Sequence, residues 1–459
     1  MIRSASLADG RKGGTSKRLW VLLLAAVLLV SVAPAVRLWR GWTGAGESGP
    51  ASTYRYRFQR APRGSVIRDL QSEIAFLQAR ISSTPDRGLD LAALAGAYLH
   101  MARATGDLSW YLLAEQAARR SLSNLPFRNT GAVLILARIA EARHDFPGAI
   151  RLANQAGGQE EGLAIKVSSY LAMGRVDLAA RAADRLVAQS PSLGSYTLRS
   201  LVRLARGQDD GATADLQRGL AAEEPGETGA SALARTYLGR LHYRRGRLDL
   251  AESLYREALR ILPQHPLTLL NLAELELRQG RFRVAEQHFS QVVTISEASP
   301  NVYDHAVLRG LARVHELQED REGAQRLWRE AERRLRRDVT TGAFGHRREL
   351  ARLLLERGRP ENVPEALSLM QAEIRIRRDA ETMDILAWAL SRSDRWEEAR
   401  QAMREALRWG VRDAAMFYRA GLIDQALGNP GGAQPFFRAA QATDPTFDAH
   451  ARRVIGLGL

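Results

Sequence analysis

Histidines and adjacent carboxylates are the residues of this 459-residue chain whose types are suited to metal binding or acid–base chemistry. The chain has nine histidines, but no two stand four residues apart, the spacing that places two metal ligands on one helical face. His315-Glu316 lacks the second histidine of a zinc-protease motif. Adjacent acids such as Glu223-Glu224 are typical of solvated helix ends rather than acid–base pairs.

Other catalytic signatures are also missing from the sequence. Cysteine is absent, which excludes disulfides, cysteine-ligated metals and cysteine nucleophiles. No phosphate-binding loop ending in Gly-Lys-Ser/Thr occurs, and neither does a Gly-x-Ser-x-Gly nucleophile turn. We therefore expect no catalytic residue, no cofactor and no metal, and the chain is predicted not to be an enzyme.

Charge is distributed unevenly along the chain. Lys and Arg number 66 and Asp and Glu number 51, so the formal net charge is +15. Residues 1–60 carry +8 of this charge, and the other 399 residues carry only +7. Because so long a segment is close to balance, nucleic acid is not an expected partner of the main part of the chain.

Residues 19–36 form an uninterrupted run of eighteen uncharged, mostly apolar residues. At about 1.5 Å per residue, a helix of this length spans roughly 27 Å, enough for a bilayer core. Five basic residues precede the run and two, Arg37 and Arg40, follow it closely, so the positive-inside rule leaves the N-terminus in the cytoplasm. The alternative is a signal peptide cleaved after Ala33-Pro34-Ala35. We expect a single-pass protein of the inner or cell membrane, with its C-terminal part periplasmic or extracellular.

A second feature near this run is a stretch of arginines and aromatic residues. Residues 54–68 alternate the two types, as contacts with anionic lipid or nucleic acid do. This stretch supports an alternative function, in which the protein binds a membrane surface or nucleic acid electrostatically.

From about residue 65 onward, helical periodicity alternates with short Gly, Asp or Pro punctuation. Residues of similar type recur 34 positions apart, as in Leu238 and Leu272 and in Gly246 and Gly280. Further pairs at this spacing are Gly239 and Ala273, Ala251 and Ala285, Ala387 and Gly421, and Ala406 and Ala440. The periodicity predicts an all-α array of repeated units.

The clearest copy of the repeat is residues 233–263. Its small residues Gly239 and Ala251 are expected where two helices cross closely, because a larger side chain would not fit there. Tyr255 is expected to fill the wider gap toward the next unit, and Pro263 ends the second helix.

These residue types at a 34-residue period resemble the tetratricopeptide repeat. The fold expected is a right-handed α-solenoid of about ten helix-turn-helix units behind one N-terminal transmembrane helix. The order of segments, which include EARHDF, DILAWAL and GAYLHMARATGDLSWYLLAEQAARRSL, is similar to a broad, functionally uncharacterised bacterial family of exported or membrane-anchored tetratricopeptide proteins. The predicted organisation is a basic cytoplasmic N-terminus at 1–18, a transmembrane anchor or uncleaved signal at 19–36, a basic, glycine-rich linker at 37–64, a capping helix at 65–87 and the repeat array at 88–459.

The resemblance implies a protein-binding function, because the first helix of each unit in this family lines a concave groove that binds peptides or helices. We therefore expect a membrane-anchored scaffold for protein–protein interactions that faces the periplasm or exterior. Arginines on that surface would pair bidentately with acidic segments of a partner. The alternative is that they are surface residues of an arginine-rich chain. The groove candidates are Arg240, Tyr243, Arg244, Asn271, Arg278, Arg309, Arg313, Arg348, Arg352, Trp388 and Tyr418.

Overall fold

The computed structural model describes residues 65–158, 160–224, 226–294, 301–341 and 346–457, which are almost wholly helical. The all-α prediction is confirmed for these residues, where the one β-type feature is an isolated bridge between Asp107 and Asn301. The helices are α2 (Ser65–Ser83), α3 (Gly88–Thr105), α4 (Ser109–Asn124), α5 (Thr130–Ala142), α6 (Phe146–Gln155), α7 (Glu160–Ala172), α8 (Val176–Gln189), α9 (Leu193–Ala205), α10 (Asp209–Ala221), α11 (Thr228–Tyr243), α12 (Leu248–Ile261), α13 (Pro266–Arg278), α14 (Phe282–Thr294), α15 (Asp304–Leu317), α16 (Arg321–Thr341), α17 (Arg347–Glu356), the 3₁₀ helix η1 (Pro360–Asn362), α18 (Val363–Glu373), α19 (Ala380–Ser391), α20 (Trp396–Leu407), α21 (Ala414–Ala426), α22 (Pro430–Thr443) and α23 (Ala449–Val454).

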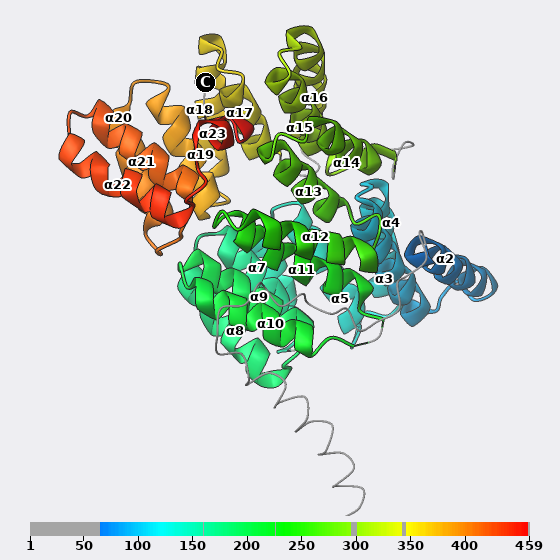
Figure 1. Cartoon of the computed structure of the whole chain (residues 1–459). Coiled ribbons are helices and arrows are strands. Elements are labelled where there is room, and N and C mark those ends of the chain that lie inside the picture. Colours follow the sequence, from blue (N-terminus) through cyan, green and yellow to red (C-terminus); the bar gives the residue numbers. More distant parts are fainter. Residues whose placement is uncertain (1–64, 159, 225, 295–300, 342–345, 458–459) are drawn as a thin grey trace, which may run out of the picture. The chain divides into compact units, whose positions relative to one another are not determined.

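Consecutive helices pack against each other in pairs (Figure 1). Within the described residues the pairs run from α3 with α4 to α21 with α22, which makes ten pairs. The first of them also contacts α2, and α13 contacts the short C-terminal helix α23. The ten pairs agree with the expected number of units, whereas the right-handed sense of the array stays a prediction.

The close helix crossing expected at Gly239 is present between α11 and α12. A Cβ atom on Gly239 would lie 2.6 Å from Cε1 of Tyr255, and Ala251 is completely buried beside this contact. In the last pair, a Cβ atom on Gly421 would lie 2.5 Å from Cε1 of Phe437. Glycine is therefore required at these positions because an aromatic ring of the paired helix occupies the space of a side chain.

In seven of the ten pairs the turn contains a glycine in the left-handed region, as in Gly246 (φ +71°) and Gly280 (φ +73°), and in the other three His144, Glu319 and Asp394 take this conformation. Glycine adopts this conformation without a steric penalty, so the recurring punctuation of the sequence has a backbone cause. A Cβ atom on Gly246 would also lie 2.5 Å from an Asp444 carboxylate oxygen, almost two hundred residues further along the chain. The turn is therefore also a point of contact with a distant unit.

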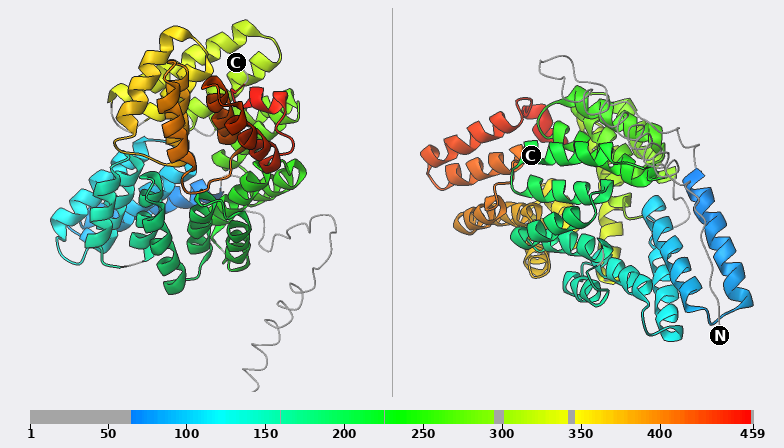
Figure 2. Two further views of the ribbon diagram at one scale, coloured as in Figure 1. Left: turned by 90° about the vertical axis from the view of Figure 1, so that its left-hand side faces the viewer. Right: turned by 90° about the horizontal axis from the view of Figure 1, so that it is seen from below.

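Contacts between distant units recur along the array. The Asn301 side-chain amide donates to the carbonyl oxygen of Thr105 at 2.7 Å, and the Arg378 backbone N–H donates to that of Ala172 at 2.9 Å. A ring nitrogen of His450 lies 3.0 Å from the carbonyl oxygen of Leu277. In both views of Figure 2 the C-terminal helices lie beside helices from the middle of the chain. Late units therefore cover the turn edges of earlier ones, which an open solenoid would leave in solvent.

The predicted membrane location is corrected by the structure. No helix of the described residues combines the length and the apolar character that crossing a bilayer requires. The longest, α16, has 21 residues but carries charged side chains throughout, and these are costly in a hydrocarbon core. A single-pass protein of the inner or cell membrane with a periplasmic or extracellular solenoid is thus not supported. The predicted segments 1–18, 19–36 and 37–64, including most of the basic stretch 54–68, lie outside the described residues.

Candidate functional site

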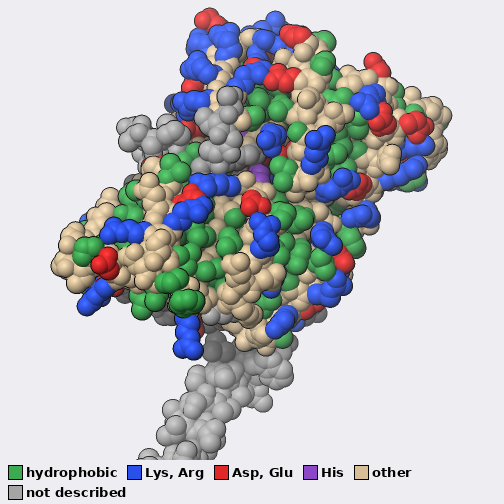
Figure 3. Space-filling model, turned by 180° about the vertical axis from the view of Figure 1, so that it is seen from behind, with side chains coloured by type: hydrophobic (Ala, Val, Ile, Leu, Met, Phe, Trp, Pro, Cys, Tyr) green, Lys and Arg blue, Asp and Glu red, His purple; other side chains and the backbone are tan. Residues whose placement is uncertain are grey.

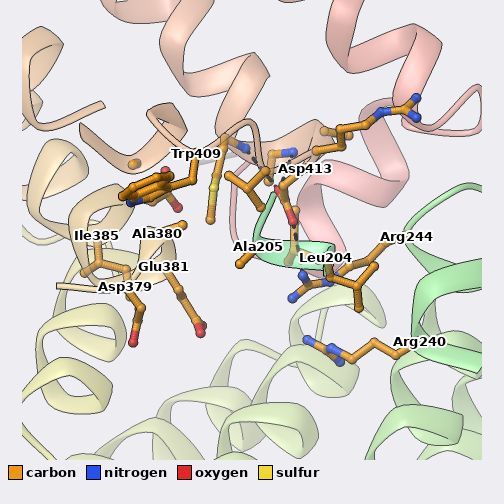
Figure 4. Close-up of a pocket in the computed structure, with 18 of the residues that line it drawn as sticks. Leu204, Ala205, Arg240, Arg244, Asp379, Ala380, Glu381, Ile385, Trp409 and Asp413 are labelled. Carbon is orange, nitrogen blue, oxygen red and sulfur yellow. Dashed lines mark hydrogen bonds and ion pairs between the residues drawn. The ribbon is translucent and has the colours of Figure 1, made fainter. Parts of the chain in front are cut away.

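A cavity of about 550 Å³ lies between early and late units of the array. Its walls come from α7, α9 and α11 on one side and from α19, α21, the loop before α19 and the loop after α20 on the other (Figure 4). Most of the wall is apolar, and it includes Leu171, Val176, Leu204, Ala205, Ile385 and Val411. The late units close this space because they contact the turns of the early units, so the cavity depends on the long-range packing.

The structure brings six of the eleven groove candidates to the wall of this cavity. They are Arg240, Tyr243, Arg244, Arg278, Arg352 and Trp388. The other five are not part of the wall: Asn271, Arg309, Arg313, Arg348 and Tyr418. Six of the residues that the resemblance assigned to one surface thus share a wall, and binding of an acidic partner segment to them stays a prediction.

Arg278 is held by the C-terminal part of the chain. Its Nη2 donates to Asp444 at 2.6 Å and to the Thr446 hydroxyl at 2.7 Å. The guanidinium carbon also lies 5.1 Å from the centre of the Tyr243 ring, within the range of a cation–π contact. The side chains of Arg278 and Asp444 are only 6% and 3% exposed, so this pair joins the two parts of the array from within.

The arginines of α15 and α17 converge on one carboxylate. Arg352 donates to Glu356 at 2.8 Å, while Arg313 and Arg309 lie 3.4 and 3.8 Å from the same group. The Glu356 side chain is almost fully buried. Because all three guanidinium groups lie near this one carboxylate, they face a group of the chain itself rather than a partner.

Glu381, at the start of α19, is a second carboxylate that contacts arginines of α17. Its carboxylate lies 3.3 Å from Arg348 and 3.3 Å from Arg352. The positive charge of Arg348 is the largest cause of the lowered Glu381 pKa, which falls to about 2. Glu381 therefore stays ionised and fixes the arginines on α17.

The two aromatic candidates of the late units are covered by arginines of the same chain. The Arg419 guanidinium lies 4.8 Å from the centre of the Trp388 ring, and that of Arg452 lies 4.7 Å from the Tyr418 ring. The two rings that were predicted to face a partner are therefore already in cation–π contact with arginines of the chain itself.

Arg240 and Arg244 resemble Arg309 in having no carboxylate of the described residues within hydrogen-bond distance, but unlike Arg309 they line the cavity. They lie 3.8 Å from Glu274 and 3.7 Å from Asp413, both beyond hydrogen-bond distance. Arg240 donates to Asn271 at 2.6 Å. Their side chains are still 37% and 40% exposed, and both point into the cavity from α11 (Figure 4). Burial lowers the pKa of Arg244, so its charge is poorly compensated.

Sequence reasoning missed the acids that balance these arginines, above all Glu356, Glu381, Asp413 and Asp444. Each stands in a helix or loop that pairs with an arginine of another helix, and Asp444 is 166 residues from its partner. Only Arg352 and Glu356 carry a local signal, because they stand four residues apart on one helix, whereas the other pairings join different parts of the chain. Within the residues that the structure describes, no group of three or more His, Cys, Asp or Glu side chains is placed to hold a metal ion.

Comparison with known proteins gives family matches to the repeat. Models described as "Tetratricopeptide repeat" match residues 197–266, 242–304 and 380–408. No curated protein matches the chain. Similar solved structures include PilW, described as a widely conserved type IV pilus biogenesis factor, with 17% identity, a TM-score of 0.37, and 46% of this chain and 94% of that one covered.

Two further structures are similar over part of the chain. A tetratricopeptide repeat protein from Parabacteroides merdae has 17% identity and a TM-score of 0.37, covering 54% of this chain and 92% of that one. A thermophilic repeat protein from Thermus thermophilus has 22% identity and a TM-score of 0.34, covering 37% and 92%. The family models carry the assignment. They match two separate parts of a described array of ten helix pairs, and the chain is a tetratricopeptide repeat protein.

Proposed function

We propose that this chain is a non-enzymatic scaffold that binds other proteins. Tetratricopeptide repeats indicate a protein–protein interaction scaffold, and the observation that carries the proposal is their match to residues 197–304 and 380–408 of the array. An array of helix pairs presents a large surface on rigid elements, which suits the binding of partner proteins.

The partner surface we propose lies on the N-terminal units. Five of the seven exposed large apolar side chains of the described residues fall between residues 76 and 127. These five are Phe76, Leu89, Leu112, Leu113 and Phe127. Phe127 is 80% exposed and Leu89 is 67% exposed. Exposed apolar side chains are costly in water, so their concentration in one part of a chain favours an interaction surface.

The composition of the surface agrees with this role. In Figure 3 apolar side chains lie between Lys and Arg side chains that are spread over the visible face rather than gathered in a single tract. Such a mixed surface is typical of protein interfaces, in which apolar anchors are surrounded by polar residues. Most of the arginines predicted to line the groove already form ion pairs within the molecule. The exposed apolar residues between 76 and 127 are therefore the better candidates for contact with a partner.

The test is cross-linking of the tagged chain in its native cells, followed by mass spectrometry. Phe76→Ser combined with Phe127→Ser should remove the specific cross-linked partners. The matched control is Val284→Ser combined with Leu422→Ser, because these side chains are also apolar and 37% and 40% exposed but lie elsewhere. Equal loss from both double variants would contradict the proposed surface. If the full chain gave no specific protein partner, the scaffold function would be wrong.

A further inference from the structure

We propose that the cavity between the early and late units binds a small amphiphile with one anionic head and an apolar chain, of the class of long-chain carboxylates. This inference goes beyond the scaffold function, because it concerns a small molecule inside the array rather than a protein on its surface.

Arg240 and Arg244 would hold the anionic head. Arg240 lies in the last turn of α11 and Arg244 directly follows the helix, four residues on, so their guanidinium groups face the same space (Figure 4). Carboxylates of the chain lie 3.8 and 3.7 Å away, too far to accept hydrogen bonds from them. Two like charges at this spacing repel each other, and an anion between them would reduce the repulsion.

The apolar wall would hold the chain of the ligand. Leu171, Val176, Leu204, Ala205, Ile385 and Val411 line the cavity opposite and beside the arginines. The volume of about 550 Å³ falls within the range of small-molecule sites. An apolar chain gains free energy on leaving water for such a wall, because the wall removes apolar surface from solvent.

Nearby acids select a head with a single charge. Seven carboxylates of the described residues line the cavity, Glu381 among them, and two others lie close to the arginine pair: Glu274 is 3.8 Å from Arg240 and Asp413 is 3.7 Å from Arg244. The low pKa of Glu381 keeps its carboxylate charged. Beside Arg240 and Arg244, a doubly charged phosphate would therefore meet the carboxylates of Glu274 and Asp413, whereas a head with one negative charge would be repelled less by them.

The test is isothermal titration calorimetry of the full chain with decanoate. Decanoate should bind with one saturable site, and octanoate should bind roughly tenfold more weakly because it buries two fewer methylene groups. Decanol and decyltrimethylammonium should show no saturable binding. Tighter binding of decyl phosphate than of decanoate would contradict the singly charged head. Tighter binding of a short peptide ending in leucine carboxylate would show that the site takes protein tails and would overturn the proposal.

Single variants distinguish binding in this cavity from a general effect of the net charge of the protein. Arg244→Gln and Arg240→Gln should each weaken decanoate binding at least tenfold, because each removes a charged contact. Ala205→Phe should also weaken it, since the ring would fill part of the cavity, and this variant leaves the net charge unchanged. Arg256→Gln is the control, because Arg256 lies on α12, is 64% exposed and pairs with Glu252.

Arg256→Gln should bind decanoate as the wild type does. An equal loss in Arg256→Gln and Arg244→Gln would reduce the effect to net charge and overturn the proposal. Circular dichroism of each variant confirms the fold, and if Arg244→Gln unfolds, Ala205→Phe alone decides the outcome. Because these results do not depend on any protein partner, their failure is distinguishable from failure of the scaffold function.

Discussion

Nη2 of Arg278 lies 2.6 Å from a carboxylate oxygen of Asp444, although 166 residues separate the two in the chain. Arg278 ends α13, and Asp444 follows the last residue of α22. The turn residue Gly246 and Thr446 lie against the same pair. This contact therefore connects the middle of the array to its C-terminal end through buried charges.

Breaking this buried ion pair should destabilise the protein strongly. Asp444→Ala leaves Arg278 buried without its carboxylate, so we expect a loss of about 3–5 kcal/mol in the free energy of unfolding. Urea denaturation followed by circular dichroism measures this loss. Arg326→Ala is the control, because Arg326 and its partner Glu322 are 60% and 86% exposed, and it should change stability by less than about 1 kcal/mol. If both variants lost the same stability, the buried ion pair would contribute no more than an exposed one. The proposed link between the two parts of the array would then be wrong.

Replacing Gly239 by a large residue should disrupt one helix crossing first. Gly239→Leu would place a side chain where the Tyr255 ring lies, and overpacking of this kind costs about 1–3 kcal/mol. Hydrogen exchange should increase around residues 233–297 before other units are affected, because each unit mainly contacts its neighbours. The double variant Gly239→Leu, Tyr255→Ala should recover part of the loss. Unchanged exchange in Gly239→Leu would contradict the contact.

Acid should destabilise the protein through its buried histidines. Burial lowers the pKa of His242 from 6.5 to about 4, and Nδ1 of this side chain is buried without a hydrogen-bond partner. The unfolded state therefore binds a proton near pH 6.5 while the folded state does not, so stability is highest above pH 6.5 and falls between pH 6.5 and 4. A shift of this size corresponds to a loss on the order of 3 kcal/mol at most.

Replacement of this histidine tests the argument. His242→Leu removes the titrating group, so its free energy of unfolding should fall less than that of the wild type between pH 7 and pH 5. Comparison of each protein with itself at pH 8, where the imidazole is neutral in both states, is the internal control. Parallel pH profiles for the wild type and the variant would contradict the role of burial at this position.

Reversing inner arginines should affect stability before it affects partner binding. Arg313 and Arg352 both lie against the Glu356 carboxylate, so Arg313→Glu with Arg352→Glu would gather like charges in a buried place. We expect a loss of several kcal/mol. Arg256→Glu with Arg329→Glu is the matched control, because these arginines lie on outer helix faces and should cost about 1 kcal/mol or less. Thermal unfolding measures the difference, and equal effects would show that only the net charge matters.

Much of the fold is local enough to be predicted from the sequence. The 34-residue spacing and the glycines of the turns predicted helix pairs, and Gly239 and Tyr255 do meet within one pair. The resemblance to the repeat family also placed Arg240, Arg244 and Arg352 on one surface, and all three line the cavity. These features depend on residues within one or two units, where the helical period fixes which side chains share a face.

Only the tertiary structure shows how the charges of that surface are paired. The sequence pattern suggested an open basic lining, whereas the folded chain places Glu356, Glu381 and Asp444 against most of its arginines. The assignment to a membrane came from residues 19–36, outside the described residues, and no described helix supports it. A period of 34 residues specifies how each unit meets the next, but it contains no information about which distant turn a late unit will reach. Which turn a late unit reaches depends on the summed curvature of many units. The charges that meet at that contact therefore cannot be paired from the sequence by itself.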